Sequence, residues 1–211
     1  MKAHPRNIFI TGIGTGVGKT LVSSILVESL QADYWKPVQA GCTPSTDRET
    51  VRSLVSNGIS EFFPESYFFE EAIAPHAAAK KKGISMSLGG IKPPVTDKPL
   101  VTEGAGGVLV PLNESEFIID LAARLDAAVV LVVSHYLGSI NHTLLSAEAL
   151  AARKLRVAGY VISGPPDVYS EAVIASCSGL RMLFRVNNEA LINRELVSRY
   201  AAQIDKRIFE K

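Results

Sequence analysis

A glycine-rich segment near the start of the chain constrains its fold more than any other feature. Residues 12–20 have the sequence Gly-Ile-Gly-Thr-Gly-Val-Gly-Lys-Thr. A short β-branched and aromatic run at residues 7–10 precedes this segment, and apolar residues at helical spacing follow it, namely Leu21, Ile25, Leu26 and Leu30. A strand, a glycine-rich turn that ends in Gly-Lys-Thr, and a helix together form the context of a phosphate-binding loop, or P-loop.

The residue types of this loop suit an anionic ligand. Glycines let backbone N–H groups turn inward around a phosphate oxygen, and the helix start adds its positive dipole end. Five residues separate Gly12 from Gly18, where the usual pattern has four, so the loop is a lengthened variant. A glycine-rich turn without a ligand is the alternative, and the Gly-Lys-Thr ending argues against it. The expected nucleotide-binding residues are Gly14, Thr15, Gly16, Val17, Gly18, Lys19 and Thr20.

Apolar runs alternate with helical patterns along the rest of the chain. We expect further strands at residues 33–38, 100–102, 127–133, 157–162 and 182–186. We expect helices at residues 19–30, 46–55, 117–125 and 140–154, between the last two strands, and from about Glu189. The strand runs are continuously apolar, which is typical of a parallel sheet covered on both faces. The predicted fold is therefore α/β, a P-loop NTPase-like, mostly parallel sheet with helices on both faces, in a single domain of residues 1–211.

Composition excludes several classes of protein. The chain has 22 basic and 21 acidic side chains, so its charge gives no reason to expect nucleic acid or an acidic membrane as a partner. The longest apolar run, residues 127–133, is far shorter than the roughly 20 residues of a membrane-spanning helix. Cys42 and Cys177 form neither a disulfide framework nor a zinc-site spacing. We therefore expect a cytoplasmic protein.

Five segments together resemble the dethiobiotin synthases in order and spacing. They are the lengthened loop of residues 11–20, Lys36-Pro37-Val38 with Gly41, Ala74-Pro75-His76, Glu103-Gly104-Ala105-Gly106-Gly107, and Leu137-Gly138-Ser139-Ile140-Asn141-His142. The match covers residues 7–162. The resemblance implies an ATP-dependent ligase of biotin biosynthesis. Such an enzyme closes the cyclic urea of dethiobiotin from 7,8-diaminononanoate and CO2 (or bicarbonate), with Mg²⁺, through a carbamate and a carbamic-phosphoric anhydride.

Lys36 lies at the carboxyl edge of a predicted strand, where open α/β sheets bind their ligands. A lysine that extends from a strand end to solvent is the alternative. By resemblance, Lys36 and Lys19 are catalytic and hold the carbamate and the transferring phosphoryl group. Fixed cations suit this chemistry, because anions form at every stage.

The expected metal ligands for Mg²⁺ are Thr20, Asp47 and Glu103. The hydroxyl of Thr20 belongs to the P-loop, and Glu103 follows a strand and precedes glycines, so its carboxylate can reach a phosphate-bound metal. The alternative for Glu103 is a surface charge on a turn. The resemblance assigns Asp47 to the metal, although Asp after Thr is also an ordinary helix start.

The remaining site residues are implied by the resemblance alone. A turn of the neighbouring subunit binds the substrate carboxylate, so the expected partner is a second copy, in a homodimer with sites completed across the interface. That turn consists of Gly138, Ser139, Ile140 and Asn141. Alternatively, Ser139 or Asn141 only caps its own helix. The other substrate-binding residues are Thr15, Lys36, Ala40 and Gly106, and the other nucleotide-binding residues are Glu103, Gly106 and Ser163.

Three positions depart from the family pattern. Ala40 stands where relatives commonly have Ser or Thr, and Gly16 stands where some have an acidic residue. Ser163 replaces an asparagine that reads the adenine edge in some relatives, so selectivity for ATP over other nucleotides stays open.

Two other functions share this fold. A partition-type ATPase switch usually carries a second lysine early in its loop, where this chain has Gly14, together with a basic or amphipathic binding segment. A cobyrinate-type amidoligase needs a separate source of ammonia, for which this chain has no room.

Overall fold

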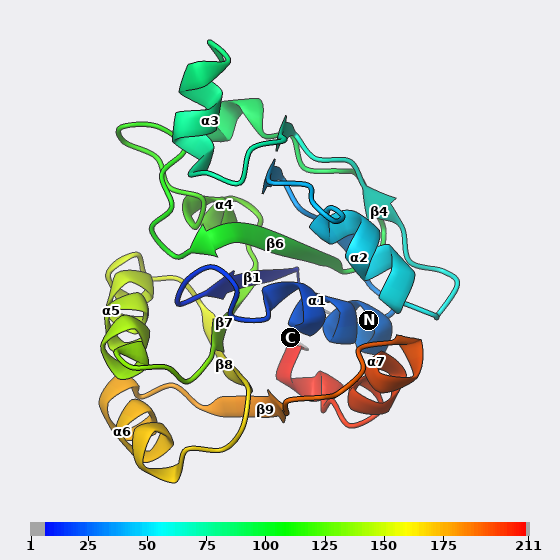
Figure 1. The fold of residues 1–211 in the computed structure, drawn as a ribbon, viewed down its shortest axis with the longest axis vertical. Coiled ribbons are helices and arrows are strands. Elements are labelled where there is room, and N and C mark those ends of the chain that lie inside the picture. The colour runs from blue at the N-terminus through cyan, green and yellow to red at the C-terminus, as the bar shows by residue number, and fades with distance from the viewer. Residues whose placement is uncertain (1–6, 210–211) are drawn as a thin grey trace.

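A parallel β-sheet forms the centre of the computed structural model, which describes residues 7–209 (Figure 1). Within these residues the sheet has seven strands in the order β4-β2-β6-β1-β7-β8-β9, and every neighbouring pair is parallel. The strands are β1 Ile8–Gly12, β2 Asp33–Trp35, β4 Phe62–Phe63, β6 Leu100–Gly107, β7 Ala128–Val133, β8 Val157–Ser163 and β9 Met182–Val186. The predicted parallel α/β sheet is confirmed.

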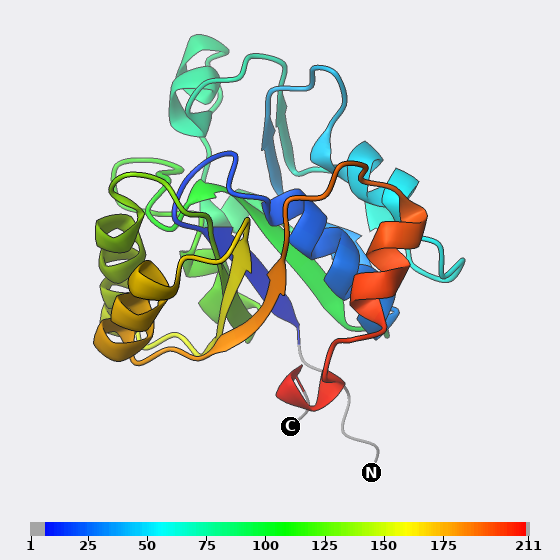
Figure 2. The ribbon, with the colours of Figure 1, turned by 60° about the horizontal axis from the view of Figure 1, so that its bottom comes forward.

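Helices cover both faces of this sheet (Figures 1 and 2). One face packs against α1 Lys19–Leu30, α2 Asp47–Leu54 and α7 Arg194–Ala201, and the other against α4 Asp120–Arg124, α5 Ser139–Ala152 and α6 Val168–Ser178. The central strands β1 and β7 are fully buried, as expected of strands covered twice. No helix within residues 7–209 has the length and apolarity to cross a membrane.

A second, small sheet lies beyond the carboxyl edge of the main one. It pairs β3 Val38–Ala40 with β5 Tyr67–Phe69 and packs against α3 Pro75–Lys81. The prediction of one strand at residues 33–38 was therefore wrong. Pro37 has no N–H to donate to a sheet, so β2 ends at Trp35 and the chain leaves for the second sheet. This break places Lys36 just past the carboxyl end of β2.

The strand predicted at residues 100–102 was expected to end at the glycine cluster that begins with Glu103, and this was wrong as well, because β6 continues to Gly107. Its glycines allow two central strands to approach closely. A Cβ atom on Gly104 would lie 3.0 Å from Cε1 of Phe9 and 3.3 Å from the carbonyl oxygen of Ile10 on β1. Glu103 consequently lies inside a central strand and is buried.

The remaining boundaries differ in smaller ways. Helix α1 spans the predicted residues 19–30, whereas α4 is shorter than predicted and α7 begins at Arg194 instead of near Glu189. Asn193 explains the later start, because its side chain caps α7 by accepting from the N–H of Leu196. The short strands β4 and β5 and two 3₁₀ turns, Leu88–Gly90 and Lys206–Phe209, were not predicted.

Candidate functional site

The glycine-rich loop joins β1 to α1 at the carboxyl edge of the sheet (Figure 1). Gly18 is the N-cap of α1 and has a φ of 93°, a left-handed conformation that favours glycine. Gly12 is restricted by space, since a Cβ atom there would lie 2.6 Å from Cγ2 of Val17. The Nζ of Lys19 donates to the carbonyl oxygen of Gly14 at 2.8 Å. The loop therefore has the strand–loop–helix form that a phosphate-binding loop requires.

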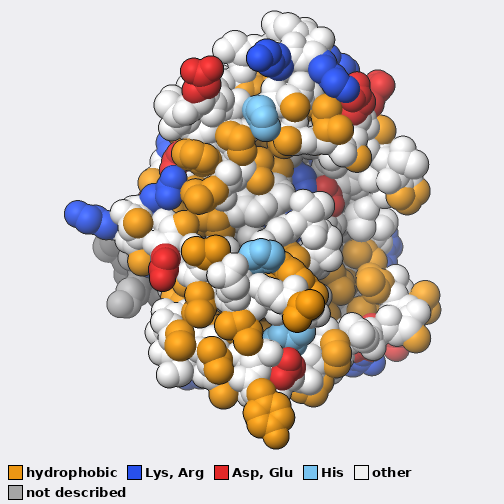
Figure 3. Space-filling view, turned by 60° about the vertical axis from the view of Figure 1, so that its left-hand side comes forward, with side chains coloured by type: hydrophobic (Ala, Val, Ile, Leu, Met, Phe, Trp, Pro, Cys, Tyr) orange, Lys and Arg blue, Asp and Glu red, His pale blue; other side chains and the backbone are white. Residues whose placement is uncertain are grey.

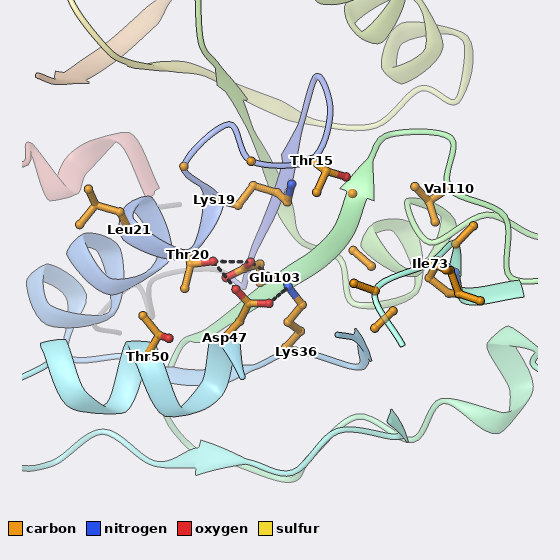
Figure 4. Close-up of a pocket in the computed structure, with 18 of the residues that line it drawn as sticks. Thr15, Lys19, Thr20, Leu21, Lys36, Asp47, Thr50, Ile73, Glu103 and Val110 are labelled. Atoms are coloured by element: carbon orange, nitrogen blue, oxygen red, sulfur yellow. Dashed lines mark hydrogen bonds and ion pairs between the residues drawn. The ribbon is translucent and has the colours of Figure 1, made fainter. Parts of the chain in front are cut away.

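A cavity of about 770 Å³ opens beside the loop (Figure 4). Its volume is in the range of small-molecule sites. It is lined by most of the site residues predicted from the sequence, namely Thr15, Gly16, Gly18, Lys19, Thr20, Lys36, Ala40, Asp47, Glu103 and Gly106. The fold thus brings together residues from the loop after β1 and from α1, β3, α2 and β6, with Lys36 just past the end of β2.

Four polar side chains form a connected cluster in this cavity (Figure 4). The Nζ of Lys36 is ion-paired with Oδ2 of Asp47 and, at 3.1 Å, with Oε1 of Glu103. The hydroxyl of Thr20 donates to Oδ1 of Asp47 at 2.5 Å and lies 3.2 Å from Oε1 of Glu103. One cation is therefore held between two carboxylates at the mouth of the P-loop.

The helix-start interpretation of Asp47 is confirmed, and the same residue also lines the cavity. It is the first residue of α2, directly after the N-cap Thr46, which forms a capping box with Glu49. A carboxylate in the first turn of a helix is favoured by the helix dipole. The same side chain lines the cavity and pairs with Lys36. The helix start therefore faces the site.

Burial and charge shift the protonation of this cluster. Burial lowers the pKa of Lys19 to about 8, with Glu103 opposing the shift and the charge of Lys36 adding to it. Burial would also lower the pKa of Lys36, but the carboxylates of Glu103 and Asp47 outweigh it and raise that pKa. Burial works against ionisation of Asp47, yet Lys36 holds the pKa of Asp47 below its usual value. Lys36 thus stays charged at neutral pH.

The oxygens of Thr20, Asp47 and Glu103 fit a magnesium ion. They are hard donors that converge on one corner of the cavity, next to the P-loop. Mg²⁺ is commonly held by one or two carboxylates together with substrate phosphates and water. No group of three or more His, Cys, Asp or Glu side chains suited to a metal occurs in residues 7–209.

The segment predicted to bind the substrate carboxylate lies elsewhere. Residues 138–141 form the start of α5 and line a separate cavity with His135 and Asp167, not the P-loop cavity of their own chain. Gly138 is the N-cap, and no side chain caps this helix start. The alternative that Ser139 or Asn141 caps the helix is therefore not what the structure contains.

Three further predicted residues do not line the P-loop cavity. Ser163 ends β8 and lies against the loop, since a Cβ atom on Gly18 would be 2.4 Å from its Oγ. Val17 is buried, and Gly14 contributes the carbonyl group that Lys19 contacts. These positions support the shape of the loop.

The structure also adds residues that the sequence did not reveal. Tyr34 and Ser23 each donate a hydrogen bond to Oε2 of Glu103 at 2.9 Å. The spacing of Tyr34 from Lys36 could have indicated its position, because residues two apart in a strand share a face. Ile192, from the segment before α7, lines the cavity without any local sequence signal.

Comparison with known proteins identifies the family of this chain. The sequence profile of the AAA domain family matches residues 6–196. The chain is 48% identical over 200 residues to the ATP-dependent dethiobiotin synthetase BioD of Cytophaga hutchinsonii, which covers 94% of this chain and 97% of the relative. The chain is 47% identical over 206 residues to the enzyme of the same name from Christiangramia forsetii. This match covers 98% of this chain and 99% of the relative. This chain belongs to the dethiobiotin synthetase family.

Solved structures with the same fold are more distant. A ParA family ATPase from Chlorobium tepidum matches with a TM-score of 0.51 at 8% identity, covering 94% of this chain and 98% of the other. The MinC:MinD cell division complex of Aquifex aeolicus matches with a TM-score of 0.53 at 14% identity. This match covers 92% of this chain and 86% of the other. At these identities the likeness shows the fold alone. Membership of the dethiobiotin synthetase family, by contrast, confirms the expected enzyme class, an ATP-dependent ligase.

Proposed function

We propose that this chain closes the cyclic urea of dethiobiotin on 7,8-diaminononanoate, with CO2 and magnesium-bound ATP as the other reactants. One observation carries the proposal. Lys36, held between Asp47 and Glu103, faces the same cavity as the P-loop residue Lys19. Two cations thereby flank the place where a P-loop puts the terminal phosphate of ATP. The dethiobiotin synthetases that resemble this chain over nearly their whole length support the choice of reaction.

The reaction has three steps that balance in atoms and charge. One amine of the substrate attacks CO2, forms a C–N bond and loses a proton, which gives a carbamate. A carbamate oxygen then attacks the γ-phosphorus of ATP and releases ADP, which leaves a carbamic-phosphoric anhydride. The second amine attacks the carbonyl carbon and loses a proton, the C–O bond to phosphate breaks, and inorganic phosphate leaves as the ring closes. Every step creates or moves negative charge, so fixed cations stabilise each transition state.

We assign the two lysines different parts of this sequence. Lys36 is held in its charged form by Asp47 and Glu103, and it orients the carbamate for attack on phosphorus. Lys19 contacts the β- and γ-phosphates, whose charge favours its protonated form. Both side chains are mostly shielded from water, which strengthens their electrostatic effect.

We assign Thr20, Asp47 and Glu103 to the magnesium ion that accompanies ATP. When bound there, this ion neutralises phosphate charge in the transition state. Thr20 would give up its hydrogen bond to Asp47, and Asp47 and Glu103 would share their negative charge between the ion and Lys36.

The carboxylate end of the diamino acid needs its own anion site. We assign it to residues 138–141, because the start of α5 has no side-chain cap and a helix N-terminus favours an anion. This segment lies outside the P-loop cavity of its own chain, so we propose a homodimer in which a second copy supplies it. Exposed apolar side chains near this segment suit such an interface: Tyr136 and Leu137 line the same cavity as residues 138–141, and Leu109 and Leu145 line another cavity beside α5. Figure 3 shows many hydrophobic side chains on this side of the molecule. Within each copy we propose that residues 1–211 act as one domain in the cytoplasm.

The proposal is tested by incubating the protein with ATP, Mg²⁺, bicarbonate and 7,8-diaminononanoate and detecting dethiobiotin by mass spectrometry. Omitting ATP or bicarbonate should each abolish the product. ATP hydrolysis that ignores the diamine and responds to DNA would instead support a partition-type switch, and would contradict the proposal.

A further inference from the structure

The carboxylate of Glu103 has an inner oxygen and an outer oxygen with different partners. Oε2, on the inner side, accepts hydrogen bonds from the hydroxyls of Tyr34 and Ser23, each at 2.9 Å. Oε1, which faces the cavity, accepts hydrogen bonds from Nζ of Lys36 at 3.1 Å and from the hydroxyl of Thr20 at 3.2 Å. The buried carboxylate is therefore anchored through one oxygen and directs the other toward the site.

The sheet register explains why these hydroxyls meet Glu103. Tyr34 on β2 lies beside Val101 on β6. Side chains alternate along a strand, so Lys36 follows Tyr34 on the same face and Glu103 follows Val101 on that face. Helix α1 covers this face and brings Ser23 to it from its second turn. Tyr34 and Ser23 are fully buried, which excludes water as a competing partner.

Tyr34 acts in this arrangement as a hydrogen-bond donor. Burial and the charge of Glu103 raise the pKa of its phenol well above the ordinary value, so the proton stays on the tyrosine. Within the part of the chain that the structure describes, Glu103 is the partner of this hydroxyl. The hydrogen bond therefore acts on the orientation of the carboxylate.

We propose that Tyr34 is a positioning residue that, with Ser23, fixes Glu103 so that a single oxygen, Oε1, is presented to the metal ion of the bound nucleotide. This inference rests on the metal role proposed above for Glu103. Lys36 explains the need for an anchor. An ammonium group has three donors, and a carboxylate that is free to turn can give both of its oxygens to it. With Oε2 occupied by Tyr34 and Ser23, Glu103 keeps one oxygen directed into the cavity.

The test measures metal binding without turnover. Mn²⁺ replaces Mg²⁺, a non-hydrolysable ATP analogue is present, and free Mn²⁺ is followed by electron paramagnetic resonance. Tyr34→Phe keeps the aromatic ring and removes only the hydroxyl. We expect Mn²⁺ to bind about 10-fold more weakly or worse, as is typical when a partner of a metal ligand is lost. Ser23→Ala removes the other donor and should also weaken Mn²⁺ binding. This variant takes the place of Tyr34→Phe in the test if Tyr34→Phe does not fold.

Two controls separate positioning from a general structural effect. Tyr200→Phe removes another phenol that donates to a carboxylate, that of Glu189 at 2.6 Å, outside the cluster, and should leave Mn²⁺ affinity unchanged. In a Glu103→Gln background, Tyr34→Phe should cause little further loss, because its effect passes through the Glu103 carboxylate. A thermal melt of each variant verifies folding.

The outcomes distinguish this inference from the proposed reaction. Unchanged Mn²⁺ affinity in Tyr34→Phe, or the same loss in both backgrounds, overturns the positioning role. Unchanged Mn²⁺ affinity in Glu103→Gln alone overturns it as well. A wild-type protein that binds Mn²⁺ with nucleotide as expected but makes no dethiobiotin contradicts the proposed function and leaves the role of Tyr34 intact.

Discussion

The Nζ of Lys36 lies 3.1 Å from Oε1 of Glu103, and both side chains are buried. A buried ion pair is costly to break by removing one partner, because the other charge is left uncompensated. Here the pair lies in a ligand cavity beside the P-loop, where a nucleotide and its metal can replace these contacts. The pair thus holds Lys36 in its charged form beside the P-loop, where anionic chemistry requires a cation.

Replacing Lys36 by alanine should lower kcat by more than about 100-fold, because a cation that acts on the transition state is lost. Steady-state kinetics at saturating ATP measures the effect. The variant leaves Asp47 and Glu103 facing each other, so added Mg²⁺ should raise its melting temperature more than that of the wild type. Lys81→Ala is the matched control, since it breaks an exposed ion pair with Glu71 and should change neither quantity. Near-normal turnover in Lys36→Ala would remove its catalytic role.

Nucleotide binding should take up protons near pH 8 because of Lys19. Its pKa is lowered to about 8 in the free protein, and phosphate charge raises it again in the complex. Nucleotide affinity should therefore fall as the pH rises above about 8. Calorimetry in buffers of different ionisation enthalpy measures the uptake, and Lys19→Ala should abolish it. Binding without proton uptake at pH 8 would show that this lysine does not change its protonation.

The same shift affects stability with a definite sign. Between pH 8 and 10.5, the ordinary pKa of a lysine, the folded chain binds fewer protons at Lys19 than the unfolded chain. The free energy of unfolding should therefore rise with pH in this window as far as Lys19 is concerned. Denaturant unfolding at several pH values gives the free energy of unfolding of wild type and of Lys19→Ala. The difference between the two proteins in the slope of this free energy against pH isolates the contribution of Lys19. Parallel pH profiles of the two proteins would contradict the assignment.

Glu103→Gln keeps the shape of the side chain and removes its charge. The Mg²⁺ concentration for half-maximal rate should rise by roughly 10-fold, because a carboxylate is a much stronger ligand than an amide for this ion. Titrating Mg²⁺ at fixed ATP measures the change. Glu116→Gln, which alters a carboxylate that bonds to Asn113, serves as the control. If the Mg²⁺ requirement is unchanged in Glu103→Gln, this residue is not a metal ligand.

Asn141→Ala should weaken binding of diaminononanoate far more than binding of ATP, if residues 138–141 hold the carboxylate. Mixing inactive Lys36→Ala chains with chains disabled in residues 138–141 should restore some turnover, since a mixed dimer rebuilds one complete site. Subunit exchange must be verified with labelled chains. No recovery despite exchange, or a fully active monomer, would contradict sites shared across an interface.

The sequence predicted the parts of the site that depend on local pattern. The P-loop from Gly12 to Thr20 and the helix after it follow from glycine conformations and a helical repeat, and both are present in the structure. It also placed Lys36 at a strand end, where Pro37 stops the pairing. These features depend on residues that are neighbours in the chain.

Other features depended on contacts between distant residues. The strand before Glu103 was expected to end at residue 102 because glycines follow, yet packing of Gly104 against Phe9 keeps Glu103 inside a longer strand. The position of the Tyr34 hydroxyl beside Glu103 depends on the register of β2 with β6, which no local pattern gives. Ile192 reaches the cavity only because the chain returns from β9 to α7 across the face of α1.

Oxygen tracing tests the central claim most directly, namely that this site transfers phosphate to a carbamate. The enzyme is given C18O2, unlabelled water, ATP, Mg²⁺ and diaminononanoate, and the products are analysed by mass spectrometry at early times. The account predicts one ¹⁸O atom in each phosphate released, together with one dethiobiotin, because the carbamate oxygen that attacks phosphorus leaves with it. Phosphate that contains no ¹⁸O, with its fourth oxygen taken from water and no dethiobiotin formed, would contradict the account.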